Sequence, residues 1–556
     1  MKVINKYLCA TLLSTVAYSA YAQIGGGGVP LLQIPPSAPQ QNEPPRFKYD
    51  RPTEAQTPAV DKTRIRVNQI KLTGTLLYPQ EDLIALTSFV PGSELSLTDL
   101  RLMTIKIADY YHSKGYFVAQ AYLPAQDIKD GVVTIAIVVG KYGQVKISNQ
   151  TNLSNGLANG LMGGVESGDQ IESGPLETRL LLLSDLAGVK VNSTLVPGTE
   201  VGTSDLLVNL TPGPRVTGSI DADNAGLPYT GSYRLGGTVN VNNLAGLGDV
   251  ASVRVLSSGS GMTYGRASYQ LQLGRATVGA AYTALGYRLG KEFSDLGAHG
   301  TANIASLYAS YPLIRSRTTN LYGQLGFDMR TYQDRVDATD TTTNKRANVL
   351  MPGIYGDHRD TLGGGGLTAY GATWSLGNLD IQSGAARDFD DATARTNGQY
   401  NKLAMNAMRL QRITDTVSFY ASVNGQLASK NLDIWEKMEL GGMYGVRAFP
   451  AGTAFGDQGY IVNLEARFLL PVISPTLPGR MHLVALFDTG SVQYNKNAWA
   501  PTDNTVSLSG AGVGLTWSDP NNFSIKTYYA HKVGNTPETV QSSGSGQFWF
   551  QLVKYF

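Results

Sequence analysis

The residue types that support catalysis or metal binding are present in this chain of 556 residues, but their spacing forms no known motif. The sequence contains no G-x-S-x-G, no Walker loop and no H-E-x-x-H. The glycine runs at 25–28 and 363–366 lack the Lys-Ser/Thr that follows a phosphate-binding loop. The sequence therefore predicts no enzyme and no catalytic, cofactor-binding or metal-binding residue. The five histidines are too scattered for a local metal motif: His112, His299, His358, His482 and His531.

The amino-terminal residues have the pattern of a secretory signal peptide. Two lysines and an apolar run over residues 7–16 precede an Ala-Tyr-Ala triplet that ends at Ala22. We therefore expect a signal peptide over 1–22, cleaved after Ala22. The single cysteine, Cys9, would leave with this peptide, so the mature chain is expected to have neither a thiol nor a disulfide.

Net charge and hydropathy limit what the mature chain can bind. Removing Lys2 and Lys6 from the 45 Lys+Arg leaves 43, equal to the 43 Asp+Glu, so the mature chain is about neutral. A nucleic-acid surface needs a basic excess, so we expect no nucleic-acid partner. After the signal peptide the longest apolar stretch is 132–139, far short of the roughly 20 residues that a membrane helix needs. Any entry into a membrane must use β-strands.

The last nine residues, 548–556, have the pattern of a β-strand that ends on Phe556. Phe548, Phe550, Leu552 and Phe556 share one parity, so one face of the strand is apolar. An unpaired strand edge costs roughly several kcal/mol per backbone amide in lipid, so this strand must close a barrel. The 63 glycines, 30 tyrosines and 16% charged residues suit many strands and turns with aromatic girdles. The pattern predicts an outer-membrane protein.

Period-2 alternation dominates the carboxy-terminal region, and we predict a transmembrane β-barrel over 214–556. Charged residues stand in mid-strand opposite an apolar stripe, which suits a water-filled lumen. A soluble β-helix or large sandwich could place these charges outside. The alternation therefore favours a membrane barrel over these folds only together with the signal peptide and Phe556. At about 20 residues per strand and connection, roughly 16 antiparallel strands fit. The polar stretch 331–360 is then expected to be a surface loop. The clearest strands are 233–241, 321–330, 417–427 and 460–468.

The region before the barrel begins with a segment rich in Pro and Gly and continues with an α+β pattern. Residues 23–62 are expected to be a linker without a core, with a turn or two of helix within 29–34. A capping box of Ser96 and Asp99 begins a predicted helix over 97–113. The order of strands and helices then recurs with a second helix over 175–186, so we predict two small α+β domains. Their expected bounds are 63–141 and 142–213.

Three runs along the chain resemble one family. The run over 111–131 resembles the first polypeptide-transport-associated (POTRA) domain of two-partner secretion outer-membrane transporters, the TpsB type of the Omp85 superfamily. The runs at 223–249 and 311–316 are similar to the barrel of the same family. The resemblance covers nearly the whole chain from residue 63. The residues that carry the POTRA 1 motif are Tyr111, Gly115, Tyr116, Ala121, Pro124, Gln126 and Gly131.

Two short motifs resemble a loop and a strand of this family. The resemblance implies that Arg447 pairs with Asp488 and anchors a long loop inside the barrel, where such a pair is bidentate and charge-assisted. The parity of 481–487 independently points Asp488 inward beside His482. The alternative is a solvated loop arginine and an ordinary lumen aspartate. The family tends to have glycine at the position of Ala448. The loop-tip motif is Val446, Arg447, Ala448 and Phe449, and the strand motif is Phe487, Asp488 and Gly490.

The resemblance implies a translocator of type V secretion. POTRA domains in the periplasm would recognise a TpsA-type exoprotein, an adhesin, a haemolysin or a contact-dependent growth inhibition toxin, and the barrel would export it unfolded. Further expected partners are outer-membrane lipid of a Gram-negative bacterium and the barrel assembly machinery during biogenesis, and the chain is expected to be monomeric. The residues 29–34 would plug the pore. The alternatives are an assembly factor (insertase), which usually has more POTRA domains, and a passive porin, which needs no receptor domains.

Overall fold

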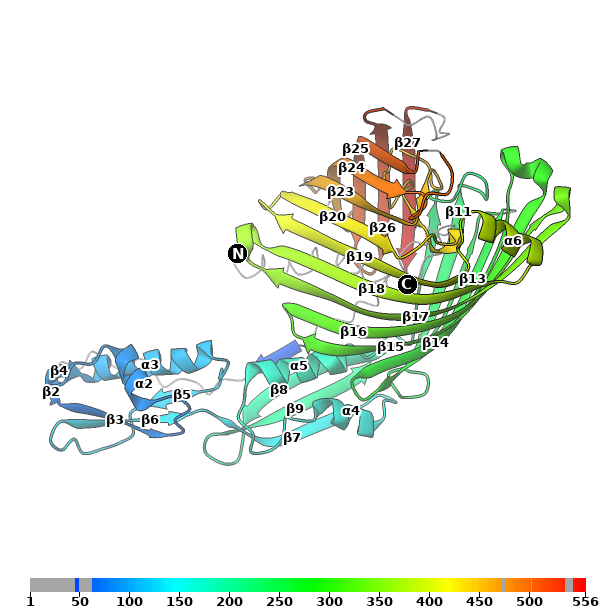
Figure 1. The fold of residues 1–556 in the computed structure, drawn as a ribbon. Coiled ribbons are helices and arrows are strands. Elements are labelled where there is room, and N and C mark those ends of the chain that lie inside the picture. Colours follow the sequence, from blue (N-terminus) through cyan, green and yellow to red (C-terminus); the bar gives the residue numbers. More distant parts are fainter. Residues whose placement is uncertain are drawn as a thin grey trace. The chain divides into compact units, whose positions relative to one another are not determined.

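The computed structural model describes residues 46–49, 63–259, 261–472, 474, 476–501, 503–535 and 544–556. It contains one compact unit within residues 42–213 and a second over Pro214–Phe556, and each is described by itself (Figure 1). The predicted signal peptide and the predicted helical turn at 29–34 lie outside the described residues.

The second unit is a closed barrel of 16 antiparallel strands, which confirms the predicted fold. Its first eight strands are β10 (Val216–Asp223), β11 (Arg234–Asn242), β12 (Val250–Ser257), β13 (Met262–Leu273), β14 (Ala276–Arg288), β15 (Ala298–Arg315), β16 (Thr319–Val336) and β17 (Thr341–Asp360). The other eight are β18 (Gly366–Ile381), β19 (Gly398–Arg412), β20 (Val417–Ala428), β23 (Gln458–Leu469), β24 (Arg480–Gln493), β25 (Thr505–Asp519), β26 (Phe523–Lys532) and β27 (Gly546–Tyr555).

The carboxy-terminal strand closes the barrel by pairing with β10, in register from Ser219↔Tyr555 to Asp223↔Gln551. Phe556 extends this pairing, because its backbone N–H and carbonyl both bond with Gly218, at 3.1 and 2.9 Å. A Cβ atom at Gly218 would lie 2.4 Å from the backbone carbonyl oxygen of Thr238 and 2.5 Å from the Phe556 ring. The seam therefore needs glycine at this position.

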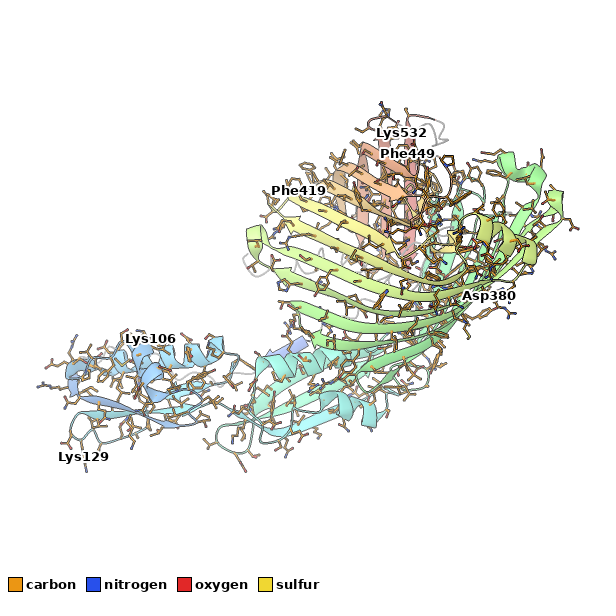
Figure 2. All side chains as sticks on the ribbon, in the orientation of Figure 1. Lys106, Lys129, Asp380, Phe419, Phe449 and Lys532 are labelled. Atoms are coloured by element: carbon orange, nitrogen blue, oxygen red, sulfur yellow. The ribbon has the colours of Figure 1, made fainter. Side chains whose placement is uncertain are left out.

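Side chains alternate between the two faces of the barrel wall as the sequence predicts. On β24, Leu483 and Phe487 are 47% and 39% exposed, whereas Val484, Leu486 and Asp488 are buried. Phe419 on β20 belongs to the same outward set (Figure 2). In the barrel of an outer-membrane protein this outward apolar face contacts lipid.

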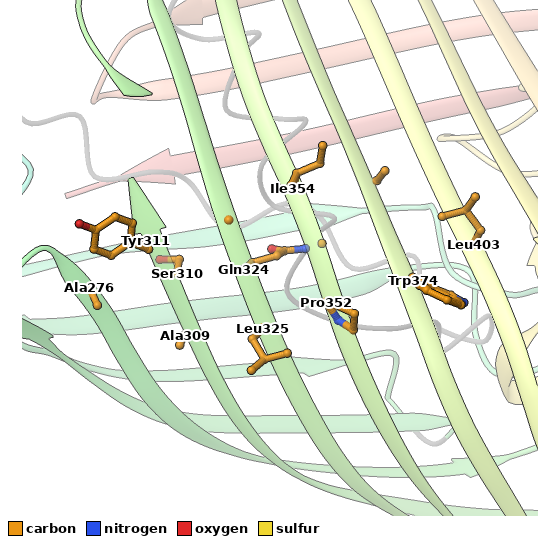
Figure 3. A pocket seen from close by; sticks show the side chains of 13 residues that line it. Ala276, Ala309, Ser310, Tyr311, Gln324, Leu325, Pro352, Ile354, Trp374 and Leu403 are labelled. Carbon is orange, nitrogen blue, oxygen red and sulfur yellow. The ribbon is translucent and has the colours of Figure 1, made fainter. Parts of the chain in front are cut away.

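An apolar depression lies on this outward face, over strands β14 to β19 (Figure 3). Small residues such as Gly323 and Ala372 form part of it, and exposed Leu325, Ile354 and Trp374 stand around it. Its lining is almost wholly apolar, so acyl chains would fill it in a membrane.

The prediction of a surface loop over 331–360 is wrong. β16 continues to Val336 and pairs with β17 up to Val336↔Thr341, with only the short helix η2 (Asp337–Thr339) between them. A membrane strand needs only about 9–11 residues, and these strands have 18 and 20. The outward side of the ends beyond the membrane faces water, as the exposed Thr331, Gln333 and Arg335 show, which explains why a paired region has a polar sequence.

The remaining short elements of this unit lie in the connections between strands. They are η1 (Lys291–Leu296), η3 (Leu362–Gly364), α6 (Gly384–Ala392), η4 (Ile434–Glu436), β21 (Met438–Glu439) and β22 (Phe455–Gly456).

The first half of the amino-terminal unit packs two helices on a small sheet. The capping box of Ser96 and Asp99 begins α3 (Leu97–Ser113), as predicted. Leu83, Ile107 and Ile135 are central to its apolar core. Its other elements are β2 (Arg64–Val67), β3 (Gln69–Gly74), α2 (Gln80–Thr87), β4 (Ser93–Ser96), β5 (Gln120–Tyr122) and β6 (Val132–Val138), with the sheet order β3-β6-β5 and a separate pair β2-β4.

The second half has its own sheet and two helices, and its core includes Val118 from the first half. Leu180 to Leu183 are all buried here, so they belong to the core. The elements are β7 (Lys141–Asn149), α4 (Asn155–Met162), α5 (Ser173–Ser184), β8 (Val189–Pro197) and β9 (Thr203–Pro212).

Part of the predicted linker is a strand, which corrects the expectation for residues 23–62. β1 (Arg46–Tyr49) pairs in parallel with β8, from Arg46↔Asn192 to Tyr49↔Leu195, and the sheet order is β1-β8-β9-β7. The composition did not reveal this strand because four residues give too short a pattern beside so many prolines.

Within the part of the chain that the structure describes, no helix is long and apolar enough to cross a membrane.

Candidate functional site

The connection between β20 and β23, residues 429–457, folds back into the barrel, and we call it the long loop. Its strands β21 and β22 pair, and its tip, residues 446–449, is closed by the bonds Val446 N–H to Leu440 O (2.8 Å) and Phe449 N–H to Val446 O (3.1 Å). Val446, Ala448 and Phe449 are buried against inward-facing residues of β24, β26 and β27, namely Val484, Leu486, Tyr528, Ala530 and Trp549. The tip thus lies inside the barrel.

The structure brings Arg447 and Asp488 together. Arg447 Nε and Nη2 donate to the two carboxylate oxygens of Asp488 at 2.8 and 2.7 Å, and the backbone N–H of Arg447 donates at 3.1 Å. Arg447 Nη1 donates to Glu465 on β23 at 2.6 Å. Glu465 is also paired with Arg467, at 2.6 Å. Arg447 therefore joins a network of two arginines and two carboxylates, a balance that a buried site needs.

This network is removed from solvent, since Arg447 is 4% exposed and Asp488 is 0% exposed. The ring of Tyr528 lies 4.9 Å from the guanidinium carbon of Arg447, close enough for a cation–π contact. Asn463 donates both to Asp488 (2.8 Å) and to Gly445 O in the loop (2.9 Å). Charge-assisted bonds of this kind are about twice as strong as neutral ones, so the tip is held firmly.

The tip also binds the strand that closes the barrel. Trp549 Nε1 donates to the backbone carbonyl of Arg447 at 2.7 Å, and Gln551 Nε2 donates to the Tyr444 hydroxyl at 2.7 Å. On the neighbouring strand β26, Lys532 Nζ lies 5.1 Å from the ring of Phe449 (Figure 2). One loop segment thus contacts β23, β24, β26 and β27.

Sequence reasoning did not assign Glu465, Asn463 and Trp549 to this site. The parity of β23 had already placed Glu465 and Asn463 on the inward face, which is the signal that could have found them. His482 shares the inward parity of Asp488 but is six residues away along β24, about 20 Å at strand spacing. The expected position of His482 beside Asp488 is therefore wrong.

Ala448 fits at the tip without strain. It is not among the described residues with positive φ, so the backbone here does not require glycine. Its methyl group lies against Gly510 of β25, where an added Cβ would stand 2.4 Å from it. Ala448 therefore fits because the wall residue that faces its methyl group is a glycine.

The other two residues of the strand motif, Phe487 and Gly490, lie on opposite faces of β24. Phe487 is on the outward face, and Gly490 faces Leu440 of the long loop, which a Cβ atom would meet at 2.7 Å.

The run at 223–249, where the barrel begins, forms a second buried ion pair. Arg234 on β11 and Asp223 on β10 are paired at 2.8 Å. The next residue, Asn224, accepts from Phe550 N–H (2.7 Å) and donates to Phe548 O (2.8 Å), so its side chain continues the pairing with β27 beyond the end of β10. Burial alone would raise the pKa of Asp249 in the following turn, but hydrogen bonds from the N–H groups of Ala245 and Leu247 lower it.

The POTRA 1 motif residues are spread through the first half of the amino-terminal unit and shape its core and turns. Tyr111 is buried, and its ring meets that of Tyr116 edge to face with centroids 6.1 Å apart. Gln126 bonds with both backbone groups of Thr134 on β6, at 2.7 and 2.8 Å, and with Pro124 O. Gly115 and Gly131 have positive φ, and Ala121 lies in β5. They form a structural motif and do not converge on one site.

Comparison with known proteins decides the family. The family model described as haemolysin secretion/activation protein ShlB/FhaC/HecB matches residues 202–517, more than half of the chain. The chain belongs to this family. The model of the ShlB-type POTRA domain matches residues 65–140. The two-partner secretion family expected from the sequence is confirmed.

Relatives of this transporter cover most of its length. It is 30% identical over 474 residues to the heme/hemopexin transporter protein HuxB of Haemophilus influenzae (strain 86-028NP), covering 84% of this chain and 82% of HuxB. It is 26% identical to the outer membrane transporter CdiB of Dickeya dadantii (strain 3937), covering 81% and 80%. The structure of CdiB from Escherichia coli has the same fold, with a TM-score of 0.69, 20% identity and coverage of 100% and 98%.

The family and the fold together locate the transporter. It is a TpsB-type protein whose barrel lies in the outer membrane and whose POTRA region lies in the periplasm, and it exports a partner exoprotein. Members of the family are transporters.

Proposed function

We propose that this transporter receives its client in an unfolded state through residues 63–213 and passes it through the barrel while Arg447 anchors the long loop. In this proposal 63–141 and 142–213 are the two POTRA domains and 214–556 is the barrel. No step of it is catalytic, and folding of the emerging client supplies the driving force. The observation that carries it is the buried network of Arg447, Asp488 and Glu465, which fixes the tip inside the barrel.

Client reception by strand addition is supported by the sheets of the amino-terminal unit. β3 and β5 are the outer strands of one sheet, and β7 is an outer strand of the other. An extended segment can add to such an edge through main-chain hydrogen bonds, with little demand on its sequence. On the opposite side of the second sheet, β8 is already paired with β1 of the same chain. β1 is the outer strand on that side, and of the strands within 63–213 we propose β3, β5 and β7 as the edges that receive the client.

The client class that we propose follows the relative with 30% identity. HuxB is named as a heme/hemopexin transporter, so we propose a client of the type that HuxB exports. A contact-dependent inhibition toxin, the alternative, is favoured by the CdiB relatives. Co-expression of this transporter with the partner exoprotein of HuxB or with that of CdiB discriminates between them, because only a matching client is expected in the medium.

The anchoring role is tested by secretion from cells that express Arg447→Ala or Asp488→Ala. Each change leaves a buried charge without its bidentate partner, and we expect at least a tenfold loss of secreted client. Arg335→Ala is the matched control, because Arg335 is an exposed arginine at the end of β16. Assembly of the barrel is checked by its resistance to unfolding in detergent without heating. Full secretion by both anchor variants would refute the role.

A further inference from the structure

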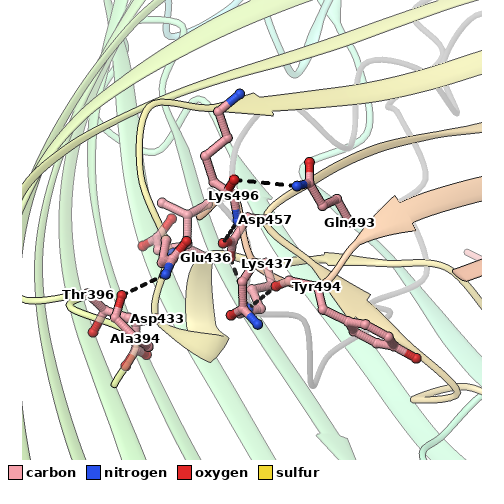
Figure 4. A network of polar contacts seen from close by, with 12 residues as sticks. Ala394, Thr396, Asp433, Glu436, Lys437, Asp457, Gln493, Tyr494 and Lys496 are labelled. Carbon is pink, nitrogen blue, oxygen red and sulfur yellow. Dashed lines mark hydrogen bonds and ion pairs between the residues drawn. The ribbon is translucent and has the colours of Figure 1, made fainter. Parts of the chain in front are cut away.

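The part of the long loop that precedes the tip makes a second set of buried contacts with the barrel. We call residues 431–437 the arm; it contains η4 (Ile434–Glu436). Figure 4 shows Asp433, Glu436 and Lys437 of the arm within a network that reaches Asp457 and Lys496. None of these residues belongs to the tip or to its partners Asp488 and Glu465.

Glu436 is the centre of the first contact. Arg330 Nη1 on β16 donates to one of its carboxylate oxygens, and Lys402 Nζ on β19 donates to the other at 2.7 Å. Arg330 is also paired with Asp328, at 2.8 Å. Arg330, Lys402 and Glu436 are all at most 4% exposed. Two cations and two carboxylates are thus buried together, and Glu436 is the only one of the four that the loop supplies.

The neighbours of Glu436 contact the same wall. Asp433 accepts from Lys345 Nζ on β17 at 2.7 Å. The ring of Trp435 stacks on Tyr332 of β16, with centroids 4.8 Å apart and an interplanar angle of 9°. Trp435 and Tyr332 are both buried in an apolar cluster that this wall forms with the loop. The arm therefore binds through charge and through an aromatic stack.

Asp457, at the other end of the long loop, ties the arm to the loop between β24 and β25. It accepts from Leu432 N–H at 3.1 Å and from Lys496 N–H at 2.7 Å, and it is paired with Lys437 at 3.0 Å (Figure 4). Asp457 is completely buried. The arm is thereby held from the wall and from the neighbouring loop.

The arm and the tip bind different parts of the barrel. The arm contacts β16, β17, β19 and β20, and the tip contacts β23, β24, β26 and β27. In the order of the barrel, β24 is the sixth strand after β16, following β17, β18, β19, β20 and β23. We propose that Asp433, Trp435 and Glu436 form a second anchor, independent of Arg447, which holds the long loop across the lumen and keeps the resting pore narrow. The role of this anchor in narrowing the pore rests on the proposed function of the barrel.

The test measures ion currents through the purified full-length chain in planar lipid bilayers. Glu436→Gln removes the one charge that the loop contributes to this cluster, so Arg330 and Lys402 keep only the carboxylate of Asp328. The arm should then leave the wall, and channel openings should become about tenfold more frequent. Asp433→Asn removes only the contact with Lys345 and should give a smaller increase, about threefold. Asp388→Asn is the matched control, an exposed acidic residue on α6, and should match the unchanged chain.

Secretion by the same variants tests independence from the tip. Because Arg447 keeps its partners, Glu436→Gln should secrete client within about twofold of the unchanged chain, whereas Arg447→Ala should not. Currents of both arm variants equal to the control would overturn the holding role, and a loss of secretion as deep as that of Arg447→Ala would overturn independence. If the unchanged chain secretes no client, the proposed function fails, and the currents still decide whether the arm is an anchor. Asp433→Asn serves alone if Glu436→Gln does not assemble.

Discussion

The interior of the amino-terminal unit is apolar with a few hydroxyl groups, whereas the interior of the barrel combines apolar clusters with buried ion pairs. Among the described residues 63–213, the buried polar side chains are hydroxyl-bearing (Thr87, Thr104, Ser184 and Ser193), and two apolar clusters form the core. The barrel buries ion pairs such as Arg234–Asp223, Arg330–Glu436 and Arg447–Asp488. A soluble domain must place its apolar residues inside, whereas a barrel places them on its outward face toward lipid. The inside of the barrel is then available for charges that hold a loop in one position.

The largest effect on stability is expected from breaking one of the buried pairs in the barrel. Asp223→Ala leaves Arg234 buried without its carboxylate and should destabilise the barrel by about 3–5 kcal/mol. The double change Asp223→Leu with Arg234→Met should recover most of this, because well-packed apolar residues can replace a buried pair. Unfolding in urea, followed by the fluorescence of the barrel tryptophans, measures both. If Asp223→Ala is as stable as the control Asp388→Ala, the ion pair contributes nothing to the stability of the barrel.

In the amino-terminal unit the larger effect is expected from removing apolar volume. Leu183 on α5 is completely buried, and Leu183→Ala should cost about 2–5 kcal/mol. Brief proteolysis of the full chain at increasing urea concentration should show this unit cleaved earlier while the barrel stays intact. Leu102→Ala is the matched control, since Leu102 on α3 is 53% exposed. Equal cleavage of the two variants would contradict an apolar core as the source of stability here.

Sequence reasoning succeeded where a pattern is local and failed where contacts join distant residues. The alternation on β24 and the apolar parity of β27 revealed the barrel, and the capping box of Ser96 and Asp99 located α3. The contact of Arg330 with Glu436 joins residues 106 apart, and no spacing or motif marks it. The strand β1 and the polar ends of β16 and β17 were missed because pairing partners stabilise them against their composition. Tertiary pairing overrides local preference in such segments.

The smallest effect is expected at the amino-terminal end of α3, whose stability should depend on pH. The N–H and hydroxyl groups of Ser96 donate to the Asp99 carboxylate at 2.9 and 2.8 Å and lower its pKa below the ordinary value. A carboxyl with a lowered pKa contributes stability above its unfolded pKa and loses it as pH falls through the folded pKa. Above the ordinary carboxyl pKa of 3.8 the first turn of α3 should therefore be unchanged, and as the pH falls below that value it should open.

Hydrogen exchange of the first-turn amides of α3, measured in the full chain from pH 7 to pH 2, checks this expectation after correction for the intrinsic exchange rate. Asp99→Asn should remove the pH dependence, and Asp109→Asn, a change on the exposed side of the same helix, should preserve it. Unchanged dependence in Asp99→Asn would mean that another group opens the helix. Because Asp99 caps only the first turn of α3, low pH should loosen this end of the helix and leave the apolar core closed, since that core contains no buried carboxylate among the described residues 63–213.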